Sequence, residues 1–176
     1  MASPGSSPPF IVNVADVPEE SSYSGQVGGA WKPLTPALAA LGGRLGANLS
    51  RLPRGYTTCP FHHHLREDEI FFVLSGRGVL RYGEALYDLG PGDCVSCPAG
   101  TGVGHQIANP YDDDLVYLAI GPNDPHEVCV YPDSGKVYVR GIGRIGLLAD
   151  QPYMAGEPDP PRVFELLAAR ERNRRR

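Results

Sequence analysis

Long apolar runs are missing from this chain of 176 residues. No window approaches the roughly 18 consecutive apolar residues of a membrane-spanning helix, so we expect no membrane-spanning segment. The start, MASPGSSPPF, contains neither the basic nor the apolar region of a secretory signal, and we therefore predict a cytoplasmic protein. In that compartment the four cysteines are expected to be reduced.

Cysteine is scarce, and only one pair has the spacing of a metal or redox motif. Cys94 and Cys97 form a CxxC, but the second CxxC that a structural zinc site usually needs is missing. The segment GDCVSCPAG is also typical of a short strand between two turns, in which residues three apart face opposite sides. We therefore expect two partly buried cysteines without a ligand or redox role.

An excess of positive charge, which nucleic-acid-binding domains usually show, is missing as well. The formal net charge is −4, and the tail RERNRRR at 170–176 holds five arginines, so the rest of the chain is more acidic still. We therefore predict no nucleic-acid partner. A basic tail can bind an anionic surface, but a frayed and solvated terminus is the more ordinary interpretation.

Glycine and proline, in contrast, are abundant, with 22 and 18 residues, and they follow no regular period. Frequent turns between short apolar runs are typical of an all-β barrel or sandwich, and a chain of this length suits one domain. The predicted strands cover residues 10–17, 44–53, 57–64, 69–76, 78–83, 84–90, 93–98, 104–109, 114–121 and 136–146. One helical turn is expected within 28–43, and a helix is expected after Pro161.

Three of the chain's five histidines stand in a row in the stretch PFHHHLREDEIFFVLSGRG, residues 60–78. On a strand, residues i and i+2 face the same side, so His62 and His64 can converge on one ion while His63 points away. Glu69 begins the next predicted strand, and a short loop can return it beside them. The other interpretation is a solvent-facing polar cluster on a loop.

A fourth ligand has to come from one of the two remaining histidines. His105 follows a glycine-rich turn and lies in a strand-like segment, whereas His126 lies in a connection rich in Pro, Gly and Asp. We therefore favour His105. Three imidazoles and one carboxylate leave one or two positions open on a first-row divalent metal, which is the condition for catalysis at the ion.

The order of these residues resembles that of the cupin superfamily, whose two motifs are G(X)5HxH(X)3–4E(X)6G and G(X)5PxG(X)2H(X)3N. The matching residues are Gly55, His62, His64, Glu69 and Gly76, then Gly92, Pro98, Gly100, His105 and Asn109. One residue is added before His62, and four residues rather than two separate Gly100 from His105. Both departures fall in turn-like segments, so they concern loop conformation more than the ligand set. The resemblance covers residues 44–121.

The resemblance implies an all-β double-stranded β-helix, which is a small jelly-roll barrel. It also implies one divalent metal inside the barrel, with the ligands His62, His64, Glu69 and His105. Iron, manganese, nickel and zinc all suit such a mixed ligand set, so the sequence does not name the ion.

The chain is predicted to divide into three parts. These are a disordered N-terminal arm at 1–9, a single cupin domain at 10–150 with its motif core at 55–109, and an extension at 151–176 with a short helix and the basic tail. Cupins commonly pair, and the segments 10–17 and 136–146 could cover an open sheet edge or extend a partner's sheet. We therefore predict a homodimer.

A metal-dependent cupin is expected to act on a small molecule, but one fold serves many chemistries. The favoured interpretation is an enzyme, with iron(II)-dependent dioxygenation first and isomerase or lyase chemistry second. The alternatives are a non-catalytic cupin that binds or senses a small ligand, and a structural, metal-free one, against which the intact ligand set argues. The sequence singles out no acid, base or nucleophile, so no catalytic residue is predicted.

Strand alternation predicts what surrounds the metal ligands. Phe71 and Val73 share the face of Glu69, and Ile107 shares that of His105. The candidates for polar contacts to a ligand are Arg51, Tyr56, Tyr82 and Tyr117. The barrel core is expected to contain Ile70, Phe72, Leu74, Leu118 and Ile120.

Overall fold

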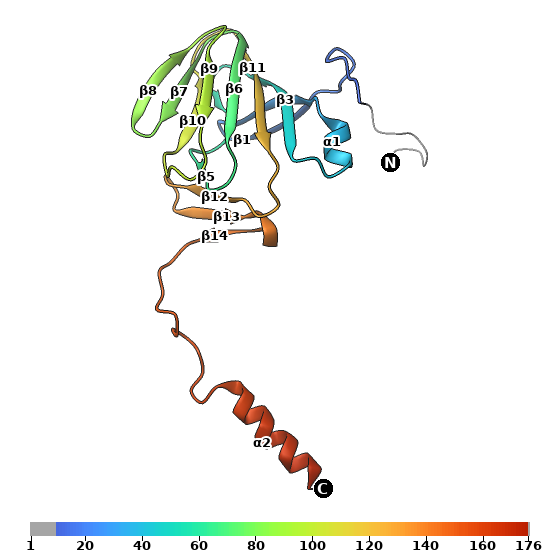
Figure 1. The fold of residues 1–176 in the computed structure, drawn as a ribbon. Coiled ribbons are helices and arrows are strands. Elements are labelled where there is room, and N and C mark those ends of the chain that lie inside the picture. The colour runs from blue at the N-terminus through green and yellow to red at the C-terminus, as the bar shows by residue number, and fades with distance from the viewer. Residues whose placement is uncertain (1–9, 176) are drawn as a thin grey trace.

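Strands dominate residues 10–175, which a computed structural model describes (Figure 1). The larger sheet contains β1 (Glu20–Ser24), β2 (Val27–Pro33), β3 (Leu45–Leu52), β4 (Tyr56–Thr57), β6 (Glu69–Ser75), β7 (Gly78–Tyr82), β8 (Ala85–Leu89), β9 (Cys94–Cys97), β10 (His105–Asn109) and β11 (Leu115–Pro122). The smaller sheet contains β5 (His63–His64), β12 (Val128–Tyr131), β13 (Lys136–Val139) and β14 (Arg144–Leu147). The helical segments are α1 (Pro36–Ala40), the 3-10 helix η1 (Arg140–Ile142) and α2 (Arg162–Arg174).

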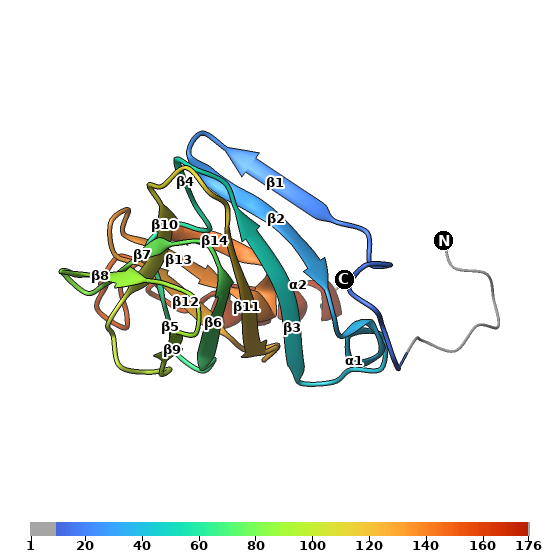
Figure 2. The same cartoon turned by 90° about the horizontal axis from the view of Figure 1, so that it is seen from above.

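The larger sheet curls round, so that β1, β2 and β3 lie across from β7, β8 and β10 (Figure 2). Its strand order is β8-β7-β10-β4-β2-β3-β11-β6-β9, with β1 beside β2, and the smaller sheet runs β14-β13-β12-β5. Among the described strands, every pair is antiparallel except β2 with β4. The predicted all-β fold, a jelly-roll barrel or double-stranded β-helix, is confirmed.

One tight turn of the barrel requires glycine. Gly76, between β6 and β7, has a φ of +76°, and a Cβ there would lie 2.1 Å from the carbonyl oxygen of Asp114. Both the left-handed backbone and the close approach exclude a side chain. Gly76 is the last glycine of the first motif, so this motif position shapes a corner of the barrel rather than the site.

The core lies on the inward faces of the curled sheet. Its most deeply buried side chains, each at most 3% exposed, are Leu52, Val73, Ile107, Leu115 and Tyr117. They come from strands in both halves of the barrel, so the core depends on the curl of the sheet.

The expected core set is wrong. Its members are Ile70, Phe72, Leu74, Leu118 and Ile120. On β6 these residues are 36–44% exposed and face outward, whereas Phe71 and Val73 follow Glu69 into the barrel. The β11 residues of the set alternate with the buried Leu115 and Tyr117 and are only partly buried. Both faces of these strands are apolar, so alternation defines two faces without saying which one is inside.

Other strand predictions need correction. Residues 10–17 form no strand, and Phe10 and Ile11 are 74% and 92% exposed. The predicted strand at 57–64 is two short strands, β4 and β5, and that at 136–146 divides into β13, η1 and β14. The sequence predicts no strand where β1, β2 and β12 lie, and the helical turn that is expected within 28–43 is α1. The remaining predicted strands agree within one residue at each end, while the arm at 1–9 lies outside the described residues.

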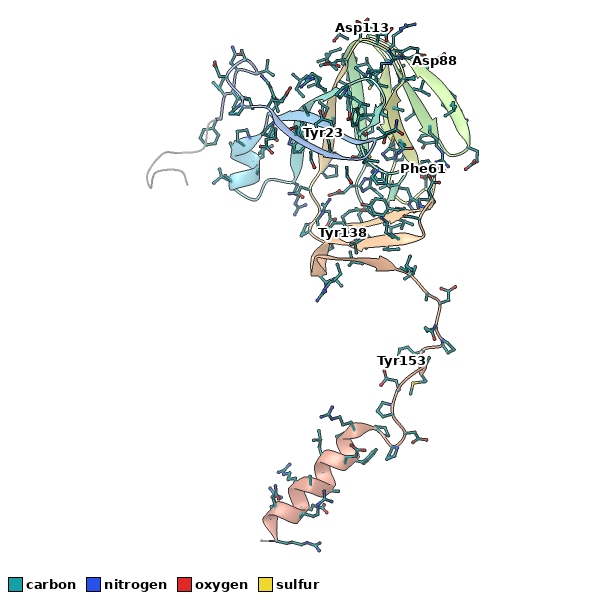
Figure 3. The ribbon with its side chains drawn as sticks, turned by 180° about the vertical axis from the view of Figure 1, so that it is seen from behind. Tyr23, Phe61, Asp88, Asp113, Tyr138 and Tyr153 are labelled. Atoms are coloured by element: carbon teal, nitrogen blue, oxygen red, sulfur yellow. The ribbon has the colours of Figure 1, made fainter. Side chains whose placement is uncertain are left out.

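Beyond β14 the chain leaves the barrel as an extended segment that leads to α2 (Figures 1 and 3). α2 begins after Pro161, where the sequence predicts a helix. Tyr153 in the extended segment is 97% exposed, and Phe164 of α2 is 57% exposed. None of the described helices has the length and apolar character needed to cross a bilayer.

Candidate metal centre

The four predicted metal ligands meet inside the barrel, brought there by three different strands. His64 belongs to β5, Glu69 begins β6 and His105 begins β10. His62 precedes β5 and forms an isolated antiparallel bridge with His105. The N–H of His62 donates to the carbonyl of His105 at 3.2 Å, and the N–H of His105 donates back at 2.8 Å. The backbone thus fixes the spacing of two histidines that are far apart in the sequence.

Glu69 lies at the centre of the cluster. Its Oε2 is 2.8 Å from Nε2 of His105, 3.2 Å from Nε2 of His64 and 3.8 Å from Nε2 of His62. One ligand atom from each of the four residues lies within 4.8 Å of the others, a set that could hold a metal ion. His63 and His126 are not part of it.

Hydrogen bonds on the far side of two imidazoles turn their Nε2 atoms toward Glu69. Nδ1 of His62 lies 2.9 Å from the carbonyl oxygen of Pro60, which can only accept, so Nδ1 carries the hydrogen. Nδ1 of His64 lies 3.3 Å from the carboxylate Oε1 of Glu127. In these neutral tautomers both Nε2 atoms keep a free lone pair for a metal.

One buried atom of the cluster supports a fit between these residues and a metal. Nε2 of His64 is shielded from solvent and makes no hydrogen bond within residues 10–175, although Glu69 Oε2 is 3.2 Å away. A buried nitrogen without a partner costs free energy. A divalent metal bound to Nε2 removes that cost, and the mixed His and carboxylate set suits iron, manganese, nickel or zinc.

Burial and mutual charge set the protonation of the ligands in the metal-free protein. Burial, aided by His105, lowers the pKa of His62 to about 4, so this ring is neutral at pH 7. Burial also opposes a charge on His64, but Glu69 and then Glu127 outweigh it and raise the pKa of His64. Burial works against a charged Glu69, yet the hydrogen bond from His105 and the nearby imidazole of His64 hold its pKa well below the usual range. A proton therefore competes with metal chiefly at His64 rather than at His62 or Glu69.

A packed aromatic ring anchors the segment before His62. Phe61 is 5% exposed and lies where the barrel meets the smaller sheet (Figure 3). The guanidinium of Arg81 lies over its ring, 3.6 Å from the centroid. Gly104 lies against the same ring, and a Cβ there would come within 2.6 Å of it. The glycine before His105 thus leaves room for the ring that anchors the other histidine segment.

A cavity of about 510 Å³ opens beside the cluster, and His62, Glu69 and His105 form part of its wall. This size suits a small-molecule ligand. The polar lining includes Ser22, Ser24, Asn48, Ser50 and Thr58, and the apolar lining includes Val27, Trp31, Phe71, Ile107 and Ala119. Burial raises the pKa of the Cys59 thiol in the wall to about 12, so this group stays protonated at neutral pH.

Several of the predicted pocket residues line this cavity: Arg51, Phe71, Ile107 and Tyr117. Val73 belongs to the core instead, and Tyr56 and Tyr82 pack against the core without lining the cavity. Sequence reasoning missed Trp31 of β2 and Asn48 of β3, because no local pattern shows that these strands curl over the histidines.

The CxxC cysteines lie on opposite faces of β9, as strand alternation predicts, but they are not both partly buried as expected. Cys94 is exposed and Cys97 is buried. All four cysteines of the chain are free thiols.

The profile of the cupin domain family matches residues 48–121. Both motifs lie in this segment, and its strands build the barrel that holds the four ligands. Residues 48–121 form a cupin domain, and the predicted resemblance to the cupin superfamily is confirmed.

Solved structures extend the likeness beyond this domain. A "putative sugar phosphate isomerase" from Acidithiobacillus ferrooxidans is 27% identical, with a TM-score of 0.68 over 77% of this chain and 86% of that one. A "sugar phosphate isomerase from a cupin superfamily" from Silicibacter pomeroyi has the same identity and TM-score over 84% and 98%. A "predicted oxalate decarboxylase" from Thermotoga maritima, 23% identical with a TM-score of 0.56 over 64% and 98%, shares the fold. None of the curated protein sequences compared with this chain matches it.

Proposed function

We propose that this cupin is a metal-dependent enzyme that isomerises a small sugar-like molecule. The observation that carries the proposal is the presence of His62, Glu69 and His105 in the wall of the 510 Å³ cavity. The residues that could hold the metal are therefore also residues that a bound small molecule would touch. A non-catalytic binding or sensing protein would need the cavity but would not need an ion there with open coordination positions.

The metal, held by His62, His64, Glu69 and His105, would supply Lewis-acid polarisation of a substrate oxygen. The protein's own groups would orient the substrate. Asn48, Ser50 and Thr58 offer an amide and two hydroxyls, which match the hydroxyls of a sugar.

Two further groups in the wall act as hydrogen-bond donors rather than bases. Burial raises the pKa of Cys59 to about 12, and burial likewise raises the pKa of Tyr117 well above that of a free tyrosine. Both groups keep their hydrogen at neutral pH. Trp31 lines the same cavity and offers an aromatic ring to the apolar face of a sugar.

The comparison supports isomerase chemistry more than the dioxygenation that the sequence favours. The two structures that are 27% identical and cover most of this chain are both named as sugar phosphate isomerases. The amide of Asn48 and the hydroxyls of Ser50 and Thr58 in the cavity lining agree with a hydroxylated substrate.

The ion pairs of Arg51 bear on whether the substrate carries a phosphate. Arg51 lines the cavity, and two carboxylates already engage its guanidinium: Glu19 and Asp114. A substrate phosphate would have to compete with both for this cation. We therefore expect an unphosphorylated sugar to be accepted at least as well as its phosphate.

Iron(II)-dependent dioxygenation is the second candidate. Phe71, Ile107 and Ala119 form an apolar wall in the cavity, which would suit an aromatic substrate. The ligand set also accepts iron, which dioxygenation requires.

The experiment begins with elemental analysis of the purified protein, followed by metal reconstitution. Aldose–ketose conversion is then followed by NMR over sugars and their phosphates, with oxygen uptake recorded in parallel over aromatic substrates. Conversion that a chelator stops and that Glu69→Gln abolishes supports the isomerase. Oxygen uptake without conversion supports the dioxygenase, and saturable binding without turnover supports the binding protein.

The remaining assignments are proposals of the same kind. We propose that residues 10–150 fold as one cupin domain and that 151–176 form an extension. We also propose a cytoplasmic homodimer without a nucleic-acid partner. The exposed outward side chains of Ile70, Phe72 and Leu74 support the dimer, since a second copy packed on this face would cover them.

A further inference from the structure

We propose that Glu127 is a positioning residue of the metal centre, which holds the imidazole of His64 so that Nε2 faces Glu69. The inference rests on the proposed metal site. It adds a residue from outside the segment 48–121 that the family profile matches.

Glu127 is completely buried, at 0% exposure. Its Oε1 accepts a hydrogen bond from the N–H of Leu65 at 2.9 Å and lies 3.3 Å from Nδ1 of His64. Its Oε2 accepts from the N–H of Arg66 at 3.0 Å. Within residues 10–175, His64 is the group at ion-pair distance from this carboxylate, and the more distant Arg140 also interacts with its charge. Burying a carboxylate is costly unless a positive group compensates it, and an imidazole with a metal on its opposite nitrogen is such a group.

The backbone fixes Glu127 in this place. Its N–H donates to the carbonyl of Asp124 at 3.1 Å, and its carbonyl accepts from the N–H of Arg140 at 3.0 Å. Glu127 immediately precedes β12, which pairs with β5 so that Cys129 lies opposite His64. The smaller sheet therefore presents the carboxylate to the ring.

A second metal site is the rival explanation for this cluster, because His64, Glu67 and Glu127 also converge. Glu67, however, is already engaged. Both Nη atoms of Arg140 donate to it, as does the N–H of Asp124 at 2.6 Å. Glu67 is also 3.8 Å from Nδ1 of His64, which is beyond hydrogen-bond distance. The cluster is better explained as a support for His64.

The chemical effect of Glu127 is the choice of tautomer. A neutral imidazole carries one hydrogen, and when Nδ1 donates it to a carboxylate, Nε2 keeps the lone pair that a metal needs. Such a carboxylate also raises the basicity of the ligating nitrogen. Without it, the ring can rotate, which moves Nε2 away from Glu69, or take the other tautomer, which places the hydrogen on Nε2 and removes the lone pair that a metal needs.

The test compares the wild-type protein with Glu127→Gln. The amide keeps the size of the side chain, but only its one oxygen accepts hydrogen bonds. In the wild-type protein, three N–H groups share the two oxygens of the carboxylate. Asp133→Asn is the matched control, because Asp133 lies in the same part of the chain and its carboxylate binds the exposed side of Arg81.

The first measurement is the ¹⁵N chemical shifts of the imidazole nitrogens in metal-free protein at alkaline pH. We expect the Nδ1–H tautomer at His64 in the wild type and in Asp133→Asn, and a shift toward Nε2–H in Glu127→Gln. An Nε2–H tautomer at His64 in the wild type would overturn the proposal without any variant.

The second measurement is the affinity for Zn²⁺, in competition with a chromophoric chelator. We expect Glu127→Gln to weaken it roughly 10–100-fold and Asp133→Asn to leave it unchanged. Unchanged affinity in a folded Glu127→Gln protein would count against the proposal. If that variant does not fold, Glu127→Asp keeps the charge, shortens the reach to His64 and takes its place. Neither measurement involves turnover, so failure of the proposed isomerase activity leaves both results interpretable.

Discussion

Ile70 and Ile120 face each other across β6 and β11 on the outside of the barrel, where Ile70 is 41% exposed. Phe72 and Leu118 form the next outward pair on the same strands. The two strands therefore carry apolar side chains on both faces, with the core and the candidate metal centre on one side and an uncovered apolar strip on the other.

The inward and outward residues should differ sharply in their contribution to stability. Leu115 is 0% exposed in the core, so Leu115→Ala should lower the free energy of unfolding by about 2–5 kcal/mol. Leu74→Ala removes the same atoms from a side chain that is 44% exposed and should cost clearly less. Chemical denaturation of the metal-free variants measures both values. Equal losses would mean that the inward and outward faces have been assigned incorrectly.

The outward strip also makes the dimer testable. Replacing Phe72 by Glu puts a charge in the middle of the strip, which a second copy could bury only at a large cost. Light scattering should give twice the chain mass of 18.9 kDa for the wild type and a single chain mass for Phe72→Glu. Leu86→Glu, at an exposed position on β8, is the control and should stay dimeric. A wild-type mass near 18.9 kDa at micromolar concentration would refute the dimer.

Removing two ligands should remove the metal without unfolding the barrel. In His62→Ala with His64→Ala, the cluster keeps only Glu69 and His105, too few to hold a first-row ion firmly. Elemental analysis should find no metal, while circular dichroism still shows a β-protein. His63→Ala is the control and should keep its metal, because His63 is not part of the cluster. Undiminished metal in the double variant would disprove the assignment.

Metal binding should weaken as the pH falls through the raised pKa of His64. Below that pH His64 holds a proton that the metal must displace, whereas His62, with a pKa of about 4, is already neutral. Because the metal binds the folded state, a chelator should lower the melting temperature at pH 7.5 and have a much smaller effect at pH 5. Calorimetry at pH 6 in two buffers should show at least one proton released per ion. The same chelator effect at both pH values would argue against histidine ligands.

The sequence predicts the cluster of three histidines and Glu69 better than it predicts the cavity and the residues around that cluster. His62 and His64 follow strand alternation, and their spacing to Glu69 and His105 matches two motifs, so local patterns are enough to find them. Trp31 and Glu127 could not be found in this way. Trp31 reaches the cavity through the curl of the sheet, and Glu127 reaches His64 through the pairing of β12 with β5. These are long-range relationships that leave no periodic pattern in the sequence.

Two errors in the predicted fold arise because apolar content alone indicates neither a strand nor the inward face of one. Phe10 and Ile11 belong to an apolar run that favours a strand, but they find no neighbouring strand and remain 74% and 92% exposed. Strand propensity forms a strand only where a partner completes the hydrogen bonds. On β6, the position of Glu69 identifies the inward face, because a candidate metal ligand is expected to point into the barrel. Apolar content alone misplaces the core.

The pairing of β5 with β12 also sets the order in which the site can be assembled as the chain is synthesised. β5 has two residues, and it belongs to a sheet whose other strands begin at Val128. A nascent chain that ends at residue 121 has both histidine motifs but has no neighbouring strand for His64. Of the four candidate ligands, His64 is the second to be synthesised, yet we expect it to be the last to be fixed in place, because its neighbouring strand β12 is made after all four.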